Sequence, residues 1–276
     1  MTAIGSLGGA IFISEDATIT MSNSQLTNNQ AEYGASIIYQ SVQSGPQKIE
    51  NITLSFDLDE TDLSTAIQSQ IRSDSDGLSL KNFTISALKT PFLSHSAGTI
   101  EIDGIDMTAL ECTDSDNSLT FCLFDFEVKE GQVLIGEISN VQVTDIYSDL
   151  PLIVSVGSNL TFSTLSIQDV ESTASVSVAS IDTSIANFDA LTLINIDSVW
   201  MTTSESILTI SNSEFDNQDK VNAGSKTLTQ FIVSSLDEVD ISSTSFSYNS
   251  ALYPTNGGVN LDFRAFSLIF LGTLHC

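Results

Sequence analysis

The sequence predicts an all-β chain folded as a repeating parallel solenoid, and three observations support this. The polar residues are mostly Ser, Thr, Asn and Asp, which are poor helix formers and favour strands broken by turns. Within short segments the apolar residues alternate with a period of two, as in strands with one buried face. These segments recur at intervals of 22 to 36 residues, which is typical of a solenoid whose loops vary in length.

Each repeat is organised around one apolar residue, which we name its anchor. Further apolar residues lie seven, five and often two positions before the anchor, and three positions after it. One repeat is too small to bury its own apolar face, so it must stack against its neighbours. The anchors are Leu26, Leu54, Ile85, Met107, Val143, Ile167, Leu193, Phe215 and Phe246.

The spacing predicts one strand-rich repeat around each anchor, in chain order. The repeats at 78–88, 100–110 and 160–170 carry the full apolar pattern. Those at 138–146, 188–196 and 208–215 carry most of it, and the one at 49–54 is the weakest copy. The first and last, at 19–26 and 239–246, share a Ser-rich segment before the anchor.

Two kinds of solenoid fit this spacing. The apolar string also looks like the strand of a leucine-rich repeat, which then needs another leucine five positions after the anchor. At that position the chain has Ala31, Thr90, Cys112, Ser148, Ser172, Ser198 and Ala251. We therefore expect a right-handed parallel β-helix of roughly nine or ten irregular rungs, with a leucine-rich-repeat-like solenoid as the alternative.

A family resemblance agrees with this expectation. The Gly8-Gly9-Ala10-Ile11 segment and the Leu26-x-x-Asn29 and Phe246-x-x-Asn249 segments resemble repeats of chlamydial polymorphic outer-membrane proteins. They are also similar to repeats of protist surface proteins with the pectin-lyase-like β-helix fold. The resemblance implies a ladder of stacked Asn side chains at a tight bend, and turn positions at Gly8, Gly9, Asn29, Gly34, Asn249, Gly257 and Gly258. It implies the fold and no activity, because this repeat carries no catalytic residues.

We expect residues 1–262 to form a single solenoid, with loop excursions near 57–77 and 111–131. The apolar tail at 263–276 is either a last strand or a truncated membrane segment, since crossing a bilayer takes roughly 20 residues. The array begins abruptly at its Gly-Gly-Ala-Ile unit, so we expect the chain to be part of a longer protein.

Cysteines and sequons indicate an extracellular setting. Cys112 and Cys122 are close enough in sequence to form a disulfide that pins the second excursion, which implies an oxidising compartment. N-glycosylation sequons begin at Asn51, Asn82 and Asn159. The predicted location is therefore extracellular or at the cell surface, with membrane association through a segment outside this sequence.

The net charge of −27, from 35 acidic and 8 basic residues, argues against nucleic acid and anionic membranes as partners. It also argues against membrane insertion by the solenoid itself. Acidic loops suit Ca²⁺, and the candidate ligands are Asp57, Asp59, Asp74 and Asp76, although a solvated acidic loop is the simpler explanation of these residues. No other cofactor is expected.

We expect no enzymatic activity. Serine is frequent throughout the chain but only two histidines occur, so the sequence does not indicate a catalytic triad. His95 is interpreted as a turn residue. The predicted function is a structural stalk or adhesin that meets a protein or glycan at a surface. The alternative is a polysaccharide lyase or hydrolase with the pectin-lyase-like fold, which would need paired carboxylates in one cleft.

Overall fold

In the computed structural model, the described residues are 4–5, 11–13, 18–27, 30–31, 34–40, 47–55, 67–113, 120–172, 176–196, 198–216, 231–233, 237–247, 261–263 and 268–271. Their regular structure is entirely β, in two large sheets and one small pair. The small pair joins β1 (Ile4–Gly5) to β4 (Gln30–Ala31).

The first large sheet, which we name the long-strand sheet, has twelve strands. They are β3 (Thr20–Thr27), β6 (Gln47–Ser55), β8 (Gly77–Leu88), β10 (Gly98–Cys112), β12 (Leu134–Ser148), β14 (Asn159–Glu171), β16 (Ile185–Ile196), β18 (Ile207–Ser211), β19 (Glu214–Asp216), β21 (Glu238–Ser242), β22 (Ser245–Ser247) and β24 (Leu268–Leu271).

The second large sheet, the short-strand sheet, has ten strands. They are β2 (Ile11–Ile13), β5 (Gly34–Gln40), β7 (Ile67–Ser73), β9 (Leu93–His95), β11 (Phe124–Glu127), β13 (Ile153–Val156), β15 (Ser177–Asp182), β17 (Val199–Ser204), β20 (Phe231–Val233) and β23 (Leu261–Phe263).

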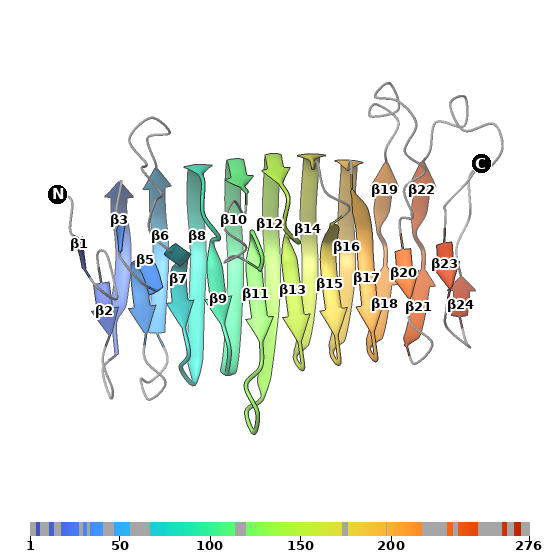
Figure 1. Cartoon of the computed structure of the whole chain (residues 1–276), viewed down its shortest axis with the longest axis horizontal. Helices are drawn as coiled ribbons and strands as arrows, with labels where there is room; N and C mark the ends of the chain where they lie inside the picture. The colour runs from blue at the N-terminus through green and yellow to red at the C-terminus, as the bar shows by residue number, and fades with distance from the viewer. Residues whose placement is uncertain are drawn as a thin grey trace.

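The chain alternates between these two sheets. Strands of neighbouring repeats hydrogen-bond in parallel, and the intervening segment crosses to the other sheet. Towards the C-terminus two short strands take the place of one long strand, so β18 and β19 both pair with β16, and β21 and β22 pair with β18 and β19. The strands therefore follow one another along the longest axis of the molecule (Figure 1). This arrangement is consistent with a parallel β-solenoid, and it differs from the leucine-rich alternative because the return segments form a second parallel sheet.

The predicted repeat register is confirmed across all nine anchors. Leu26 pairs with Leu54, and Leu54 pairs with Ile85. The same column of partners continues through the remaining anchors without a shift, ending with Phe215 against Phe246. The period of the apolar residues therefore predicted both the strands and their alignment.

Stacking these repeats buries an aliphatic and aromatic core between the sheets. Phe162 and Phe188 stack face to face on neighbouring strands, with ring centroids 4.6 Å apart. Phe83 in the long-strand sheet meets Phe92, just before β9, edge to face at 6.1 Å. Such contacts add to the hydrophobic burial that holds the repeats together.

Three expectations about the ends and loops change in detail. Strands β7 and β11 lie inside the two predicted excursions, so parts of 57–77 and 111–131 belong to the short-strand sheet. In the apolar tail, Leu268–Leu271 forms β24, which pairs with β21. No helix among the described residues is long and apolar enough to cross a membrane.

Candidate functional site

A bend recurs in the long-strand sheet three positions before each anchor. Every residue in this column has a positive φ, between 49° and 76°, which turns the strand within a single residue. We name this set the bend column: Asn23, Asn51, Asn82, Gly104, Asn140, Thr164, Ala190, Asn212 and Ser243. Five of its members are Asn, the non-glycine residue that best tolerates this conformation.

At its N-terminal end the bend column forms a ladder of side-chain amides. Nδ2 of Asn82 donates to Oδ1 of Asn51 at 2.9 Å, and Nδ2 of Asn51 donates to Oδ1 of Asn23 at 3.3 Å. Gly104 ends this ladder, since a Cβ built on it would lie 2.9 Å from Oδ1 of Asn82. The ladder ties three neighbouring repeats together at the bend.

The sequence predicts an Asn ladder through Asn29 and Asn249, three positions after their anchors, and both residues lie outside the described residues. At the same position of the middle repeats Leu88, Leu110 and Ile146 are buried in the core, so the ladder that the structure describes lies six positions earlier. Gly34 begins β5 beside a register irregularity. The other predicted turn residues, namely Gly8, Gly9, Asn29, Asn249, Gly257 and Gly258, lie outside the described residues. The recurrence of Asn three positions before the anchor was the signal that would have located the ladder.

Two of the three sequon asparagines are members of this ladder. The side-chain nitrogens of Asn51 and Asn82, which a glycan would modify, are the atoms that donate the ladder hydrogen bonds. Asn159 begins β14 and is not a member of the bend column. All three asparagines are exposed, so what distinguishes Asn51 and Asn82 is that their side-chain nitrogens donate the ladder hydrogen bonds.

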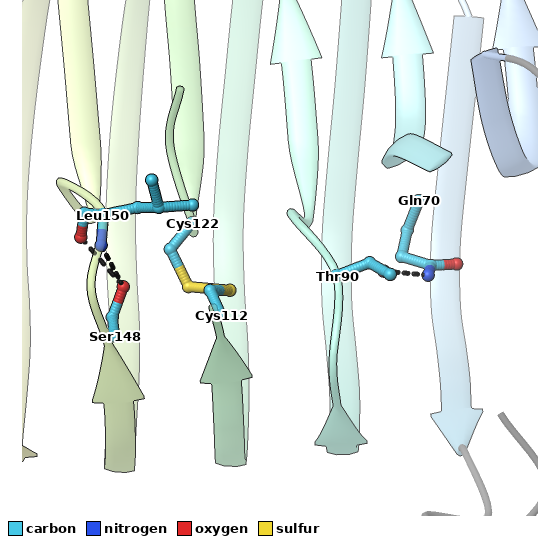
Figure 2. Close-up of a disulfide and its surroundings, with 6 residues drawn as sticks. All are labelled: Gln70, Thr90, Cys112, Cys122, Ser148 and Leu150. Atoms are coloured by element: carbon cyan, nitrogen blue, oxygen red, sulfur yellow. Dashed lines mark hydrogen bonds between the residues drawn. A yellow bond between two sulfur atoms is a disulfide. The ribbon is translucent and has the colours of Figure 1, made fainter. Parts of the chain in front are cut away.

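A second polar column lies five positions after the anchors, where a leucine-rich repeat would need leucine. Five of its members, Thr90, Cys112, Ser148, Ser172 and Ser198, are buried. Figure 2 shows the first three at the ends of neighbouring strands. Thr90 accepts a hydrogen bond from Gln70, Cys112 forms a disulfide with Cys122, and Ser148 binds the backbone of Leu150.

The disulfide connects the end of β10 to the segment just before β11. Cys122 also takes part in the backbone ladder, donating its N–H to Pro151 at 2.8 Å and accepting from Phe92 at 3.0 Å. The bond therefore fixes the crossing from one sheet to the other within a single repeat. Both cysteines are fully buried.

A serine ladder forms the opposite crossing, nine positions before the anchors. The N–H groups of Ser158 and Ser184 each donate to the hydroxyl of the next serine, Ser184 and Ser206, at 3.1 Å. The N–H of Ser206 donates to Oδ1 of Asp237 at 2.8 Å. These buried groups satisfy one another, so this column holds neighbouring repeats together.

The calcium candidates that are described do not form a cluster. Asp74 is buried and accepts from Oγ of Ser96 at 2.9 Å, with Nζ of Lys129 at 3.1 Å and a guanidinium nitrogen of Arg72 at 3.9 Å. Asp76 is exposed, and its backbone carbonyl accepts from Thr99. Among the described residues no group of three or more His, Cys, Asp or Glu is arranged to hold a metal. Asp57 and Asp59 lie outside the described residues.

His95 is a strand residue rather than the predicted turn residue, and it is completely buried at the end of β9. Its Nδ1 lies 3.1 Å from the carbonyl oxygen of Ser73, while Nε2 has no partner among the described residues. Burial lowers the pKa of His95 to about 4, so the ring is neutral at pH 7.

Asp125 has the most perturbed carboxyl group of the described chain. Burial raises its pKa to about 6, and the hydrogen bond that it accepts from Oγ of Ser94 at 3.0 Å opposes the rise. Its partners in the neighbouring strands are Ser94 and Val154, so neither side supplies a second carboxylate. The nearest acidic residue on the same strand is Glu127.

Comparison of the chain with protein-family models, with curated proteins and with solved structures found no match.

Proposed function

We propose that this chain is a non-catalytic element of a surface or extracellular protein, folded as a right-handed parallel β-helix of the pectin-lyase-like class. In this proposal it acts as a stalk or adhesin that presents its outer faces to a protein or glycan. The observation that carries the proposal is the unbroken register of anchors from Leu26 to Phe246. A continuous stack of parallel strands makes a rigid, elongated body, which is what a stalk requires.

The polar ladders support this proposal because their interactions are internal. The amides of Asn51 and Asn82 bind along the bend column, and Ser158, Ser184 and Ser206 bind one another's backbones. Hydrogen bonds of this kind bridge neighbouring repeats, so they resist bending and unzipping along the axis. An oxidising environment fits the buried disulfide between Cys112 and Cys122.

The enzymatic alternative is less well supported by the described carboxylates. Glycoside hydrolysis uses two carboxyl groups about 5 to 9.5 Å apart on either side of the scissile bond. Asp125 has the raised pKa of a general acid, but its strand neighbours are Ser94 and Val154. A lyase would need an available base, whereas Lys129 and Lys81 are paired with Asp74 and Glu101.

Antibody labelling tests the proposed location. Antibodies raised against the purified chain should label intact cells of the source organism, or its culture medium. Labelling that appears only after the cells are permeabilised would contradict a surface or extracellular role. The same labelling on cells pretreated with an external protease should be lost.

A polysaccharide assay tests the absence of catalysis. The purified chain should release neither reducing ends nor unsaturated uronates from acidic and neutral polysaccharides, with and without Ca²⁺. Release of reducing ends that is abolished in Asp125→Asn, at unchanged thermal stability, would establish the hydrolase alternative. Release of unsaturated uronates would establish the lyase alternative.

A further inference from the structure

The exposed large aliphatic side chains of the described residues gather at one edge of the long-strand sheet. Val133 is 63% exposed, Ile135 52%, Ile185 39% and Ile207 44%. Most other large apolar side chains of the described residues are buried, so these four are exceptions. We name Val133, Ile135, Ile185 and Ile207 the aliphatic ridge.

Strand register places Ile135, Ile185 and Ile207 of the ridge in a line along the solenoid axis, and Val133 lies two residues before Ile135. Ile135 pairs with Asn159, Asn159 with Ile185, and Ile185 with Ile207. Since neighbouring strands lie about 4.8 Å apart, Ile185 and Ile207 are about 5 Å apart and the line spans roughly 14 Å. A binding segment that meets all of it must run parallel to the long axis, across the strands shown in Figure 1.

The chain around the ridge is mainly acidic, and the nearby Lys129, four residues before Val133, is paired with Asp74. No Lys or Arg occurs between Lys129 and Lys220, an interval that contains thirteen Asp and Glu residues. Glu137 follows Ile135 on the same face of β12, and Glu205 lies two residues before Ile207; both are exposed. Glu238 is the strand partner of Ile207 and is also exposed.

We propose that the aliphatic ridge and its acidic rim bind a cationic, amphipathic segment of a partner protein. Aliphatic side chains of the partner would cover the ridge, and its Lys or Arg residues would face Glu137, Glu205 and Glu238. Charge complementarity favours this occupant over a second copy of the chain, because two copies would bring acidic rims together. It also disfavours an anionic lipid surface.

The spacing suits an amphipathic helix. A helix rises about 1.5 Å per residue, so side chains three residues apart match the spacing of Ile185 and Ile207. Three turns of helix cover the whole line to Ile135. This proposal gives the proposed adhesin a class of partner, namely a cationic amphipathic segment. It depends on the adhesin function only for its biological setting. Its test uses purified protein, so its failure would leave the antibody test of location unaffected.

The probe is a fluorescein-labelled peptide of about 18 Leu and Lys residues with one apolar face, and fluorescence anisotropy reports its binding. The protein variants are Ile185→Ser/Ile207→Ser and, as a matched control, Ile194→Ser. Ile194 also lies on β16, but it sits on a part of the sheet remote from the ridge and is partly exposed. A peptide of identical composition but scrambled order controls for charge alone.

We expect the peptide to bind wild type and Ile194→Ser equally, and to bind the double variant about tenfold or more weakly. Binding should weaken as salt rises, and hydrogen exchange should slow at 133–137, 185–189 and 205–209. Equal binding by the double variant, or by the scrambled peptide, would overturn the proposal in favour of unspecific charge attraction, as would the absence of binding at low salt.

Sedimentation of the protein alone supplies one further outcome. Self-association of wild type that is lost in Ile185→Ser/Ile207→Ser would mean that a second copy covers the ridge, and it would overturn the assignment to a cationic partner. Circular dichroism of each variant checks that the fold is unchanged, which is expected because both positions face solvent.

Discussion

The buried His95 and the half-buried Asp125 make opposite contributions to the pH dependence of stability. The pKa of His95 is about 4 in the folded chain and 6.5 ordinarily, so the unfolded chain binds more protons between these values. The stability that His95 contributes is therefore present above pH 6.5 and lost as the pH falls towards 4. At 1.36 kcal/mol per pH unit, this amounts to roughly 3 kcal/mol.

Asp125 acts in the opposite sense. Its pKa is about 6 in the folded chain and 3.8 ordinarily, so the folded chain binds more protons between these values. Its contribution therefore falls as the pH rises from about 4 to 6. In wild type the two effects offset each other over this window.

Single variants should separate these two contributions. Relative to wild type, Asp125→Asn should gain unfolding free energy as the pH rises from 4 to 6, because only the rise from His95 remains. Relative to wild type, His95→Asn should lose unfolding free energy over the same range. Urea unfolding at closely spaced pH values measures both differences. Parallel curves for all three proteins would contradict the assigned pKa directions.

At the scale of one bend, the Asn ladder should contribute measurably to stability. Asn82→Ala removes the hydrogen bond to Asn51. It also places alanine, which tolerates positive φ less well than asparagine, at a φ of 53°. We expect it to lower the unfolding free energy by about 1 to 2 kcal/mol. Asn82→Gly loses the same hydrogen bond but accepts the positive φ, so it should cost less than Asn82→Ala.

A matched control for the ladder is available in the same column. Ala190 has a φ of 57° and makes no ladder hydrogen bond, so Ala190→Gly should be neutral or stabilise by up to about 1 kcal/mol. Thermal and urea unfolding would measure all three variants. Equal losses from Asn82→Ala and Ala190→Gly would show that neither the ladder nor the positive φ controls stability at the bend.

The sequence predicted the repeats more accurately than their bends, and the reason is physical. Burial of an anchor such as Phe215 depends only on the period of apolar residues, which is visible in the sequence. A bend depends on the conformation of one residue, and the bend column accepts Thr164 and Ala190 as well as Asn140 and Asn212. The positive φ at Thr164 or Ala190 leaves no sequence signal, because strand stacking imposes it.

The titratable residues of the short-strand sheet show the same limit. His95 and Asp125 lie in strands of three and four residues, which are too short for their period to show which segments return to the short-strand sheet. The ridge residues Ile185 and Ile207 look like core residues in the sequence, yet they face solvent. Only the register of β16 and β18 shows that they lie in one line.

At the scale of the whole molecule, a solenoid distributes its stability over neighbouring repeats, so a local crosslink stabilises its own neighbourhood most. The disulfide between Cys112 and Cys122 closes a loop with a sequence separation of 10. Loop-closure entropy then predicts that Cys112→Ser/Cys122→Ser loses roughly 2 to 3 kcal/mol of unfolding free energy. Serine suits the site at Cys112, because its strand partner Ser148 carries a hydroxyl in the same column.

Hydrogen exchange should show which strands lose stability in the double serine variant. In the double serine variant, amides of β9, β11 and β13 should exchange faster, whereas those of β16 and β18 should change little. Wild type treated with a reductant strong enough to reach the buried bond should behave like the variant. Uniform acceleration along the whole chain would contradict the repeat-by-repeat view of its stability.

The net charge of −27 should make the stability of the whole solenoid depend on salt. At about 0.01 M salt the screening length is about 30 Å, so carboxylates on distant repeats repel one another; at 0.15 M it falls to about 8 Å. We therefore expect the midpoint of thermal unfolding to rise as NaCl is added, and then to level off.

The same thermal unfolding series with Ca²⁺ separates charge screening from calcium binding. Each Ca²⁺ sample is matched to NaCl for ionic strength, and a chelator is then added. Because Asp74 is already held by Lys129 and Ser96, we expect Ca²⁺ to add no shift beyond screening at that position. A larger rise that the chelator reverses, and that Asp57→Asn/Asp59→Asn abolishes while Asp74→Asn does not, would instead assign a calcium site to the acidic sequence that includes Asp57 and Asp59.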